Sequence, residues 1–221
     1  MHGVEGRCYG HGVVSLYDRI VGMPFVYTRI RPLIVSGIDM TPSYRNLAVE
    51  PGDVVVDVGC GPGEALKYLH GFRALHGFDT DPVAIDFARK IAAGRPDVTF
   101  EARVLTADDL ARLQPERVMM NGLLHHLSDD EAVDLLTMCA RTPSVRRIAT
   151  QDVVFVPGQL VSNLLARLDR GKFVRNEDGF LKLVARAGLT VKTKAIVPSH
   201  PNGGRALYLI MALERPADAA V

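Results

Sequence analysis

The sequence has almost no net charge, because 26 lysines and arginines oppose 25 aspartates and glutamates and leave +1 at pH 7. Without a positive excess, no overall field draws the chain to nucleic acid or to an anionic membrane surface. It also lacks an uninterrupted apolar run of about 18 residues, which a membrane-spanning helix would need. We therefore expect neither a nucleic-acid nor a membrane partner.

Cysteine is scarce as well. The three cysteines, Cys8, Cys60 and Cys139, are widely spaced and show neither a disulfide framework nor a metal-ligand pattern. We expect reduced thiols and no metal site. The first residues contain no basic segment leading into an apolar core, as a secretory signal would. These features predict a cytoplasmic protein.

The chain has two textures. Up to about Gly52 the pattern is helical but interrupted by prolines. Beyond it, short β-branched runs alternate with amphipathic stretches, which is typical of a parallel sheet with crossover helices. We predict strands and helices in the second part. The strands are expected at 53–58, 75–78, 98–100, 117–120, 147–154, 189–197 and 206–213, and two late helices at 159–169 and 177–187.

Two helix starts are marked by capping residues. Asp81-Pro82 combines an N-cap with proline in the first helical turn. Behind it, Val83, Phe87 and Ile91 recur every four residues and would form the face that packs on the core. Ser128-Asp-Asp-Glu131 is a capping box that should open another helix.

A glycine-rich segment follows the first strand and reads Asp57-Val-Gly-Cys-Gly-Pro-Gly63. Glycines there allow a tight turn and let a ligand approach bare backbone, and a helix opened by the turn would favour negative charge at its amides. Dinucleotide-binding folds share this feature. Their fingerprint, however, needs a small residue where this chain has Glu64, and it has no use for an acid at Asp57.

The segment resembles motif I of class I methyltransferases that depend on S-adenosylmethionine (SAM), an acid-x-Gly-x-Gly-x-Gly pattern. The resemblance implies SAM as the cofactor and S-adenosylhomocysteine as its product. The residues that it places at the cofactor are Asp57, Gly59, Cys60, Gly61 and Gly63.

An acid ends the next strand about 20 residues further on, where a carboxylate can accept hydrogen bonds from both ribose hydroxyls of an adenosine. The resemblance gives that role to Asp79, with Thr80 beside it. The family usually has an aspartate-alanine pair at the adenine. Here Leu105 and Thr106 stand at the matching place, and Asp108 would substitute if the register slipped by two residues.

The segment Met119-Met-Asn-Gly-Leu-Leu-His-His-Leu127 closely resembles motif IV of small-molecule methyltransferases. The resemblance places Asn121, Gly122 and Leu123 along the methionine part of SAM. His125 and His126 follow, and a neutral histidine at the transferred methyl group could act as general base. We place His126 slightly ahead of His125. The alternative is that one histidine caps the next helix or bonds to the backbone.

Residues 1–46 resemble the variable helical lid over the acceptor pocket in this superfamily, and residues 47–221 would form the SAM-binding core. The candidates to reach the acceptor are Tyr17, Tyr27, Arg29 and Arg31, and residues 169–175 form a second candidate pocket wall. The arginines would suit an anionic acceptor, because guanidinium groups bind carboxylates and phosphates well. The alternative is a solvated helical face with buried tyrosine rings.

These features predict an α/β protein: a single Rossmann-like, doubly wound, seven-stranded sheet with an N-terminal helical lid. Asn121-Gly-Leu-Leu does not match the Asn/Asp-Pro-Pro-aromatic motif of amino-methylating DNA enzymes. We predict a methyltransferase that acts on an O, N or C atom of a small molecule, and a monomer or homodimer. A short chain with a variable lid suits work in secondary metabolism. The alternatives are an NAD(P)-dependent oxidoreductase and a catalytically silent SAM-binding partner subunit.

Overall fold

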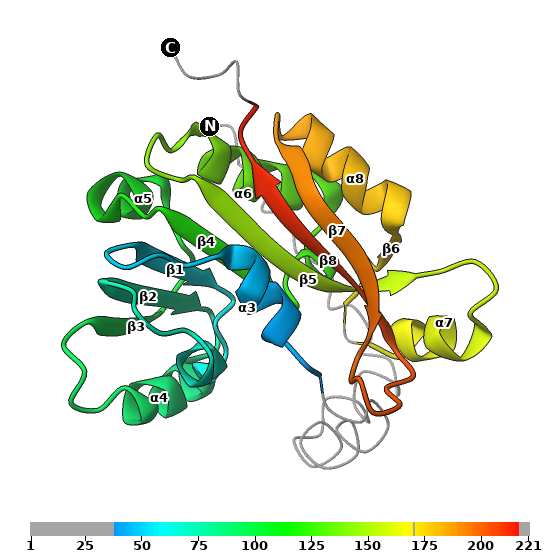
Figure 1. The fold of residues 1–221 in the computed structure, drawn as a ribbon, viewed down its shortest axis with the longest axis horizontal. Helices are drawn as coiled ribbons and strands as arrows, with labels where there is room; N and C mark the ends of the chain where they lie inside the picture. Colours follow the sequence, from blue (N-terminus) through cyan, green and yellow to red (C-terminus); the bar gives the residue numbers. More distant parts are fainter. Residues whose placement is uncertain (1–37, 170, 217–221) are drawn as a thin grey trace, which may run out of the picture. The chain divides into compact units, whose positions relative to one another are not determined.

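The computed structural model describes residues 38–169 and 171–216, which form a twisted sheet with helices on both sides (Figure 1). Along the sheet the strands follow the order β3-β2-β1-β4-β5-β8-β7. Their bounds are β1 (Val54–Val58), β2 (Ala74–Asp79), β3 (Val98–Ala102), β4 (Arg117–Asn121), β5 (Arg147–Phe155), β7 (Thr190–Pro198) and β8 (Leu207–Glu214).

The strands from β3 to β5 all run parallel, and β8 is antiparallel to both of its neighbours, β5 and β7. All five residues of β1 are buried, as expected of a strand covered on both faces. The seven predicted strands are thus confirmed. A short additional strand, β6 (Arg175–Asn176), pairs with the end of β5 and was not predicted.

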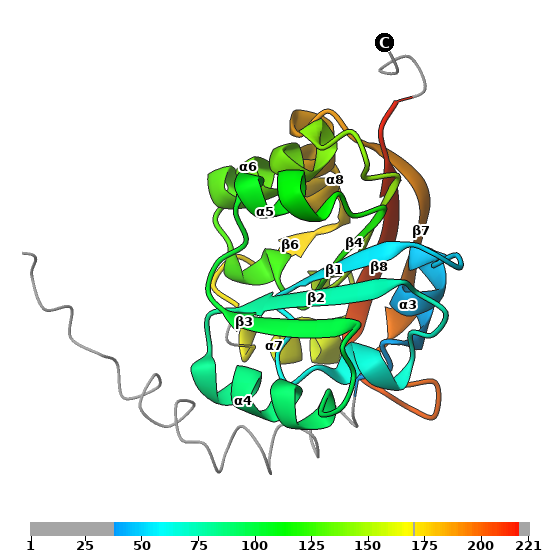
Figure 2. The ribbon, with the colours of Figure 1, turned by 90° about the vertical axis from the view of Figure 1, so that its left-hand side faces the viewer.

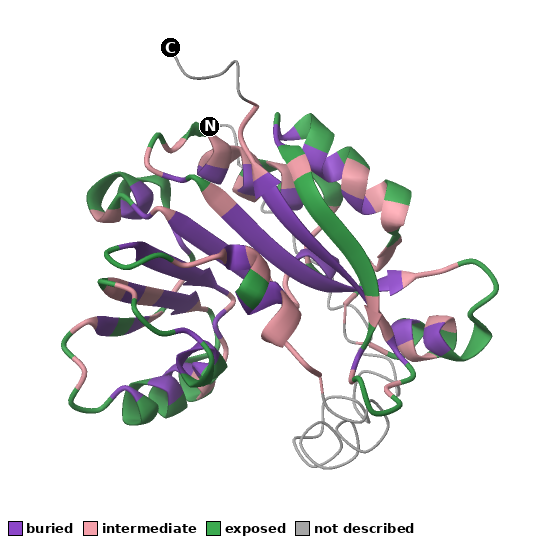
Figure 3. Ribbon diagram, in the orientation of Figure 1, coloured by how far each residue is buried: buried purple, intermediate pink, exposed green. Residues whose placement is uncertain are grey.

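Helices cover the two faces of the sheet as two layers (Figure 2). One layer contains α3 (Thr41–Leu47), the 3-10 helix η2 (Glu64–Lys67), α4 (Pro82–Ile91) and α7 (Leu160–Arg167). The other contains α5 (Ala107–Leu113), α6 (Asp129–Arg141) and α8 (Glu177–Arg186). The inner strands are the most continuously buried part of the fold (Figure 3). Doubly wound packing of this kind confirms the predicted fold class.

Local signals fixed the ends of several helices as expected. The Asp81 side chain accepts hydrogen bonds from the amides of Val83 and Ala84, and Ser128 forms a reciprocal capping box with Glu131. These bonds satisfy amides that have no partner within the first turn.

The predicted core face of α4 is wrong. Val83, Phe87 and Ile91 are 63%, 55% and 48% exposed, whereas Ile85 and Ala88 are fully buried. A four-residue spacing drifts around a helix of 3.6 residues per turn, so it does not by itself identify the inner face. The small Ala88 faces inward because it lies under the glycine-rich turn, where an added Cβ on Gly63 would be 3.1 Å from the Ala88 Cβ.

Most of the predicted lid, and with it Tyr17, Tyr27, Arg29 and Arg31, lies outside the described residues. The predicted boundary between residues 46 and 47 stays a prediction. Within the described part, α3 contacts β4, β5 and β8. None of the helices in that part is both long and apolar enough to cross a membrane.

Candidate functional site

Two of the segments that carry predicted cofactor residues meet where the strand order changes direction. From β1 the parallel strands continue one way to β2 and β3, and from β4 they continue the other way to β5. Open α/β sheets bind ligands at the carboxyl ends of strands beside such a switch point. The two segments that follow β1 and β4 meet there, since a Cβ added to Gly59 would lie 3.2 Å from Leu123 Cδ1.

The glycine-rich turn is anchored to β2 by its backbone. The amides of Gly59 and Cys60 both donate to the carbonyl oxygen of Phe78, at 2.8 and 3.2 Å. Gly61 has a φ of 51°, and a Cβ built on it would meet nothing within 4 Å. Bare backbone with open space beside it is what a closely approaching ligand requires.

The helix expected after this turn is present but short. It is the four-residue 3-10 helix η2, with Gly63 as its N-cap. The chain between Tyr68 and the start of β2 at Ala74 has to return to the sheet, which leaves no length for a longer helix. Any attraction of negative charge therefore comes from a few amides and not from a full helix dipole.

Asp79 ties this turn to the start of α4. Its Oδ2 accepts a hydrogen bond from the Gly61 amide at 2.8 Å, and its Oδ1 accepts one from the Asp81 amide at 2.9 Å. A carboxylate oxygen has more than one acceptor direction, so both oxygens can still accept from a ligand. The ribose contact of Asp79, and a contact of the exposed Thr80 beside it, stay predictions.

Asp57 is buried at the carboxyl end of β1, with 5% of its surface exposed. Burial, reinforced by the negative charge of Asp79, raises the pKa of Asp57 to about 8. Desolvation penalises the ionised carboxylate, and a nearby cationic group would favour it. Asp57 is therefore placed to gain from a positively charged ligand group.

At the predicted adenine contact, Thr106 is the N-cap of α5 and exchanges hydrogen bonds with Asp109. Its hydroxyl donates to Asp109 Oδ2 at 2.7 Å, while Arg103 holds both oxygens of the same carboxylate. The Thr-x-x-Asp pattern of this capping box was visible in the sequence and was missed. Leu105 is buried and Asp108 is exposed, and the adenine contact stays a prediction.

At the end of β4, Asn121 is engaged by the neighbouring helix. Its Oδ1 accepts a hydrogen bond from the Ser43 hydroxyl of α3 at 2.6 Å, and its Nδ2 is buried without a hydrogen-bond partner. The Gly122 amide then donates to the Gln151 carbonyl of β5 at 2.8 Å. Ser43 is a site neighbour that sequence reasoning missed, because its contact spans 78 residues of the chain.

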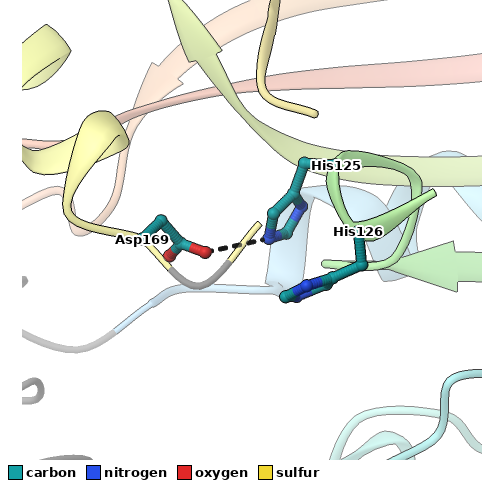
Figure 4. A group of neighbouring side chains, drawn as sticks. All are labelled: His125, His126 and Asp169. Atoms are coloured by element: carbon teal, nitrogen blue, oxygen red, sulfur yellow. Dashed lines mark ion pairs between the residues drawn. The ribbon is translucent and has the colours of Figure 1, made fainter. Parts of the chain in front are cut away.

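His125 is held between two carboxylates from distant parts of the chain (Figure 4). The residue is 3% exposed, and its Nδ1 lies 2.8 Å from Asp152 Oδ1. Its Nε2 lies 3.2 Å from Asp169 Oδ1. The ring of His126, which is exposed, extends beneath it with the two ring centroids 4.2 Å apart.

This setting changes the chemistry of His125. Burial by itself lowers the pKa of His125, but the hydrogen bonds and charges of Asp152 and Asp169 outweigh that effect and raise it to about 9. At neutral pH the imidazole of His125 therefore carries a proton and cannot accept another. The structure thus gives the two adjacent histidines different environments.

The segment after α7 packs directly on His125. The Phe173 amide donates to the His125 carbonyl oxygen at 3.0 Å, and a Cβ added to Gly171 would lie only 2.1 Å from His125 Cδ2. Arg175 donates to the carbonyl oxygens of Leu124 and Leu127, at 2.9 and 2.8 Å. Part of the run 169–175, predicted as a pocket wall, thus borders the histidine pair.

Asp152 was missed by sequence reasoning. The available signal was the polar run Thr150-Gln151-Asp152 inside an otherwise apolar strand, where all three residues are fully buried. Buried polar groups need partners, so such a run points to a structured polar site on one of its faces.

Residues 55–143 match a family model described as a methyltransferase domain. No curated protein matches the chain significantly. Among solved structures, the chain is similar to one titled a complex between the Haloferax volcanii Trm112 methyltransferase activator and the putative methyltransferase. Identity is 18%, coverage is 87% of this chain and 96% of that chain, and the TM-score is 0.64.

Two further structures share the fold. A cyclopropane synthase from Mycobacterium tuberculosis is 10% identical, with a TM-score of 0.61 and coverage of 80% of this chain and 82% of that one. The magnesium protoporphyrin IX methyltransferase from Synechocystis, with bound S-adenosylhomocysteine, is 19% identical, with a TM-score of 0.56 and coverage of 94% and 91%. At these identities the likeness establishes a common fold.

Proposed function

We propose that the chain, whose residues 55–143 match a methyltransferase domain, acts as a class I SAM-dependent methyltransferase on an O, N or C atom of a small-molecule acceptor. The observation that carries the proposal is the contact between the glycine-rich turn and the end of β4 at the switch point. This contact brings together two segments that resemble SAM-binding motifs, although about 60 residues separate them.

The residues present fit SAM as the cofactor. Gly61 offers open backbone, and the buried carboxyl of Asp57 suits a ligand that carries an ammonium and a sulfonium group. Asp79 would hold the ribose, and Asn121 to Leu123 would lie along the methionine part. When bound, SAM supplies a methyl group on a good leaving group. The protein then has to hold the acceptor in line with it.

A small-molecule acceptor agrees with the lack of a positive excess over the whole chain. If Arg29 and Arg31 reach the acceptor, an anionic one is favoured, since guanidinium groups bind carboxylates and phosphates in bidentate fashion. The cytoplasmic location and the monomer or homodimer state stay predictions.

An acceptor that loses a proton on methylation needs a group to receive it. His126 suits this role better than His125, because His126 is exposed beside the site while two carboxylates keep the pKa of His125 raised. His125 would then act as a positioning residue that supports the turn carrying His126.

The test is methyl transfer from SAM with an isotopically labelled methyl group to a panel of small phenols, carboxylic acids, amines and thiols. We expect labelled product and S-adenosylhomocysteine in equal amounts. Asp79→Ala should abolish transfer at low SAM by weakening cofactor binding, and Asp86→Ala, at an exposed position on α4, should not. SAM binding without transfer to any acceptor would instead favour the silent partner subunit.

A further inference from the structure

We propose that His125, His126 and Asp169 bind a divalent transition-metal ion of the zinc type, at a site that the sequence did not predict. One potential ligand atom from each residue lies within 4.8 Å of the other two. Figure 4 shows the Asp169 carboxylate directed at the His125 ring, with the His126 ring below the His125 ring. Imidazole nitrogen and carboxylate oxygen are ligands that zinc accepts.

The distances inside the cluster suit a shared ion. Zinc bonds of 2.0–2.1 Å place two ligand atoms of a tetrahedral site about 3.3 Å apart. His125 Nε2 and Asp169 Oδ1 are separated by 3.2 Å. Binding of the ion would displace the proton that His125 holds on this Nε2, so the metal would take the place of the His125–Asp169 ion pair. His126 completes the set, since one of its ring nitrogens lies within 4.8 Å of both other ligand atoms.

His125 has a carboxylate partner on its second ring nitrogen, as metal-binding histidines usually do. Asp152 Oδ1 lies 2.8 Å from Nδ1 and also accepts a hydrogen bond from the His125 backbone amide at 3.2 Å. A carboxylate on one ring nitrogen fixes the tautomer and turns the other nitrogen toward the ion. Asp152 is fully buried, so water does not compete for its contact with the ring.

The third ligand is also held in place. Asp169 Oδ1 accepts a hydrogen bond from the Gly171 amide at 3.0 Å, and the Phe173 amide bonds to the His125 carbonyl. The ion would therefore join the turn after β4 to the segment after α7. Two histidines and one carboxylate leave one tetrahedral position open, as in catalytic zinc sites.

An open position would suit an anionic oxygen or sulfur of the acceptor. This consequence rests on the proposed function, whereas the ion site itself does not. With an ion bound, His126 would be a ligand and not the proton acceptor. The two roles of His126 can be told apart by experiment. Methyl transfer is sensitive to chelators only if His126 is a metal ligand, and not if it is the proton acceptor.

The experiment is a titration of untagged, chelator-treated protein with Co²⁺, followed by its visible absorption and by displacement with Zn²⁺. We expect a saturable tetrahedral Co²⁺ spectrum. His126→Ala and Asp169→Asn should each weaken binding by about 100-fold or more, since loss of a supporting carboxylate such as Asp152 alone costs about 10- to 100-fold. His70→Ala and Asp134→Asn change exposed residues elsewhere and should bind normally.

Thermal unfolding followed by circular dichroism establishes that each variant is folded. The proposal is overturned if the unaltered protein gives no Co²⁺ spectrum, or if His126→Ala, at an exposed position, binds with unchanged affinity. Since neither SAM nor an acceptor is present, either failure would leave the methyl-transfer proposal intact. Conversely, absence of methyl transfer would not remove the Co²⁺ spectrum.

Discussion

Asp57 buries a carboxyl group next to a second acid, and this should make the protein more stable in mild acid than in base. Its pKa is raised from 3.8 to about 8 by burial first and by the charge of Asp79 second. The folded state therefore holds a proton that the unfolded state releases. The stabilisation is fully present below about pH 4 and is lost as the pH rises through about 8.

Replacing this group by a neutral one should remove that pH dependence. We expect Asp57→Asn to exceed the unaltered protein in free energy of unfolding at pH 8 by at least about 1.4 kcal/mol, the equivalent of one pKa unit. The two should be similar near pH 4. Urea unfolding of ligand-free protein across this range measures it, with the exposed Asp86→Asn as control. Equal stabilities at pH 8 would show that the Asp57 carboxylate is accommodated without cost.

His126 should contribute to the rate of turnover and very little to the affinity for SAM. We expect His126→Ala to lower kcat by about two to four powers of ten while the SAM affinity stays nearly the same. Steady-state kinetics together with calorimetry measure both quantities, and His70→Ala is the matched control on an exposed histidine. Unchanged turnover would assign His126 a structural role. A loss that chelator treatment of the unaltered protein reproduces would favour the ion over the base.

Arg175 joins two segments around the histidine pair. Its guanidinium group bonds to the carbonyl oxygens of Leu124 and Leu127 and to the Asp129 carboxylate. A lysine keeps the charge but cannot reach these acceptors together. We expect Arg175→Lys to lower the free energy of unfolding by about 2 kcal/mol, given that hydrogen bonds to charged groups contribute about 1.5–3 kcal/mol.

A matched control is Arg186→Lys, which changes an exposed pair with Asp130 on the same side of the fold. Pairs of that kind contribute little, so the control should stay within about 1 kcal/mol of the unaltered protein. Chemical denaturation measures both variants. If Arg175→Lys unfolds like the control, the bonds to the turn do not hold it in place.

Thr106 at the start of α5 has two candidate roles, capping the helix and contacting adenine, and they can be tested separately. As an N-cap, Thr106→Ala should cost about 1 kcal/mol of stability, and Thr106→Ser should cost much less because it keeps the hydroxyl. If the hydroxyl also contacts adenine, Thr106→Ala will weaken SAM binding as well. Thermal unfolding and calorimetry on both variants decide this. Full stability in Thr106→Ala would contradict the capping role that the hydrogen bonds indicate.

Elements whose signals are local were predicted well from the sequence. The caps at Asp81 and Ser128 depend on residues within three positions of each other, and both formed as expected. The orientation of α4 depends instead on what lies beneath it. The prediction chose the wrong face for the core, because the helix has apolar residues on two faces. Val83 and Phe87 are the larger pair, but Ile85 and Ala88 are the buried pair. Only the packing under the glycine-rich turn decides between the two faces.

Across the whole molecule, the sequence sufficed to predict the sheet but not the polar cluster within it. The strands themselves and their burial follow from apolar runs that alternate with helices, and the structure agrees with them, whereas their order was not predicted. His125 was a candidate, but its partner Asp152 is 27 residues away. The pairing of Asp152 and Asp169 around one ring is set by the register of β4 on β5 and by the return of the chain after α7.

The central claim is that the end of the sheet at β1 and β4 binds SAM. The most direct measurement is parallel calorimetric titration of the purified protein with SAM, S-adenosylhomocysteine and NADH. We expect micromolar dissociation constants for both adenosyl ligands, none measurable for NADH, and much weaker binding of SAM to Asp79→Ala. Binding of NADH with no response to the adenosyl ligands would contradict the claim and assign the glycine-rich turn to a dinucleotide.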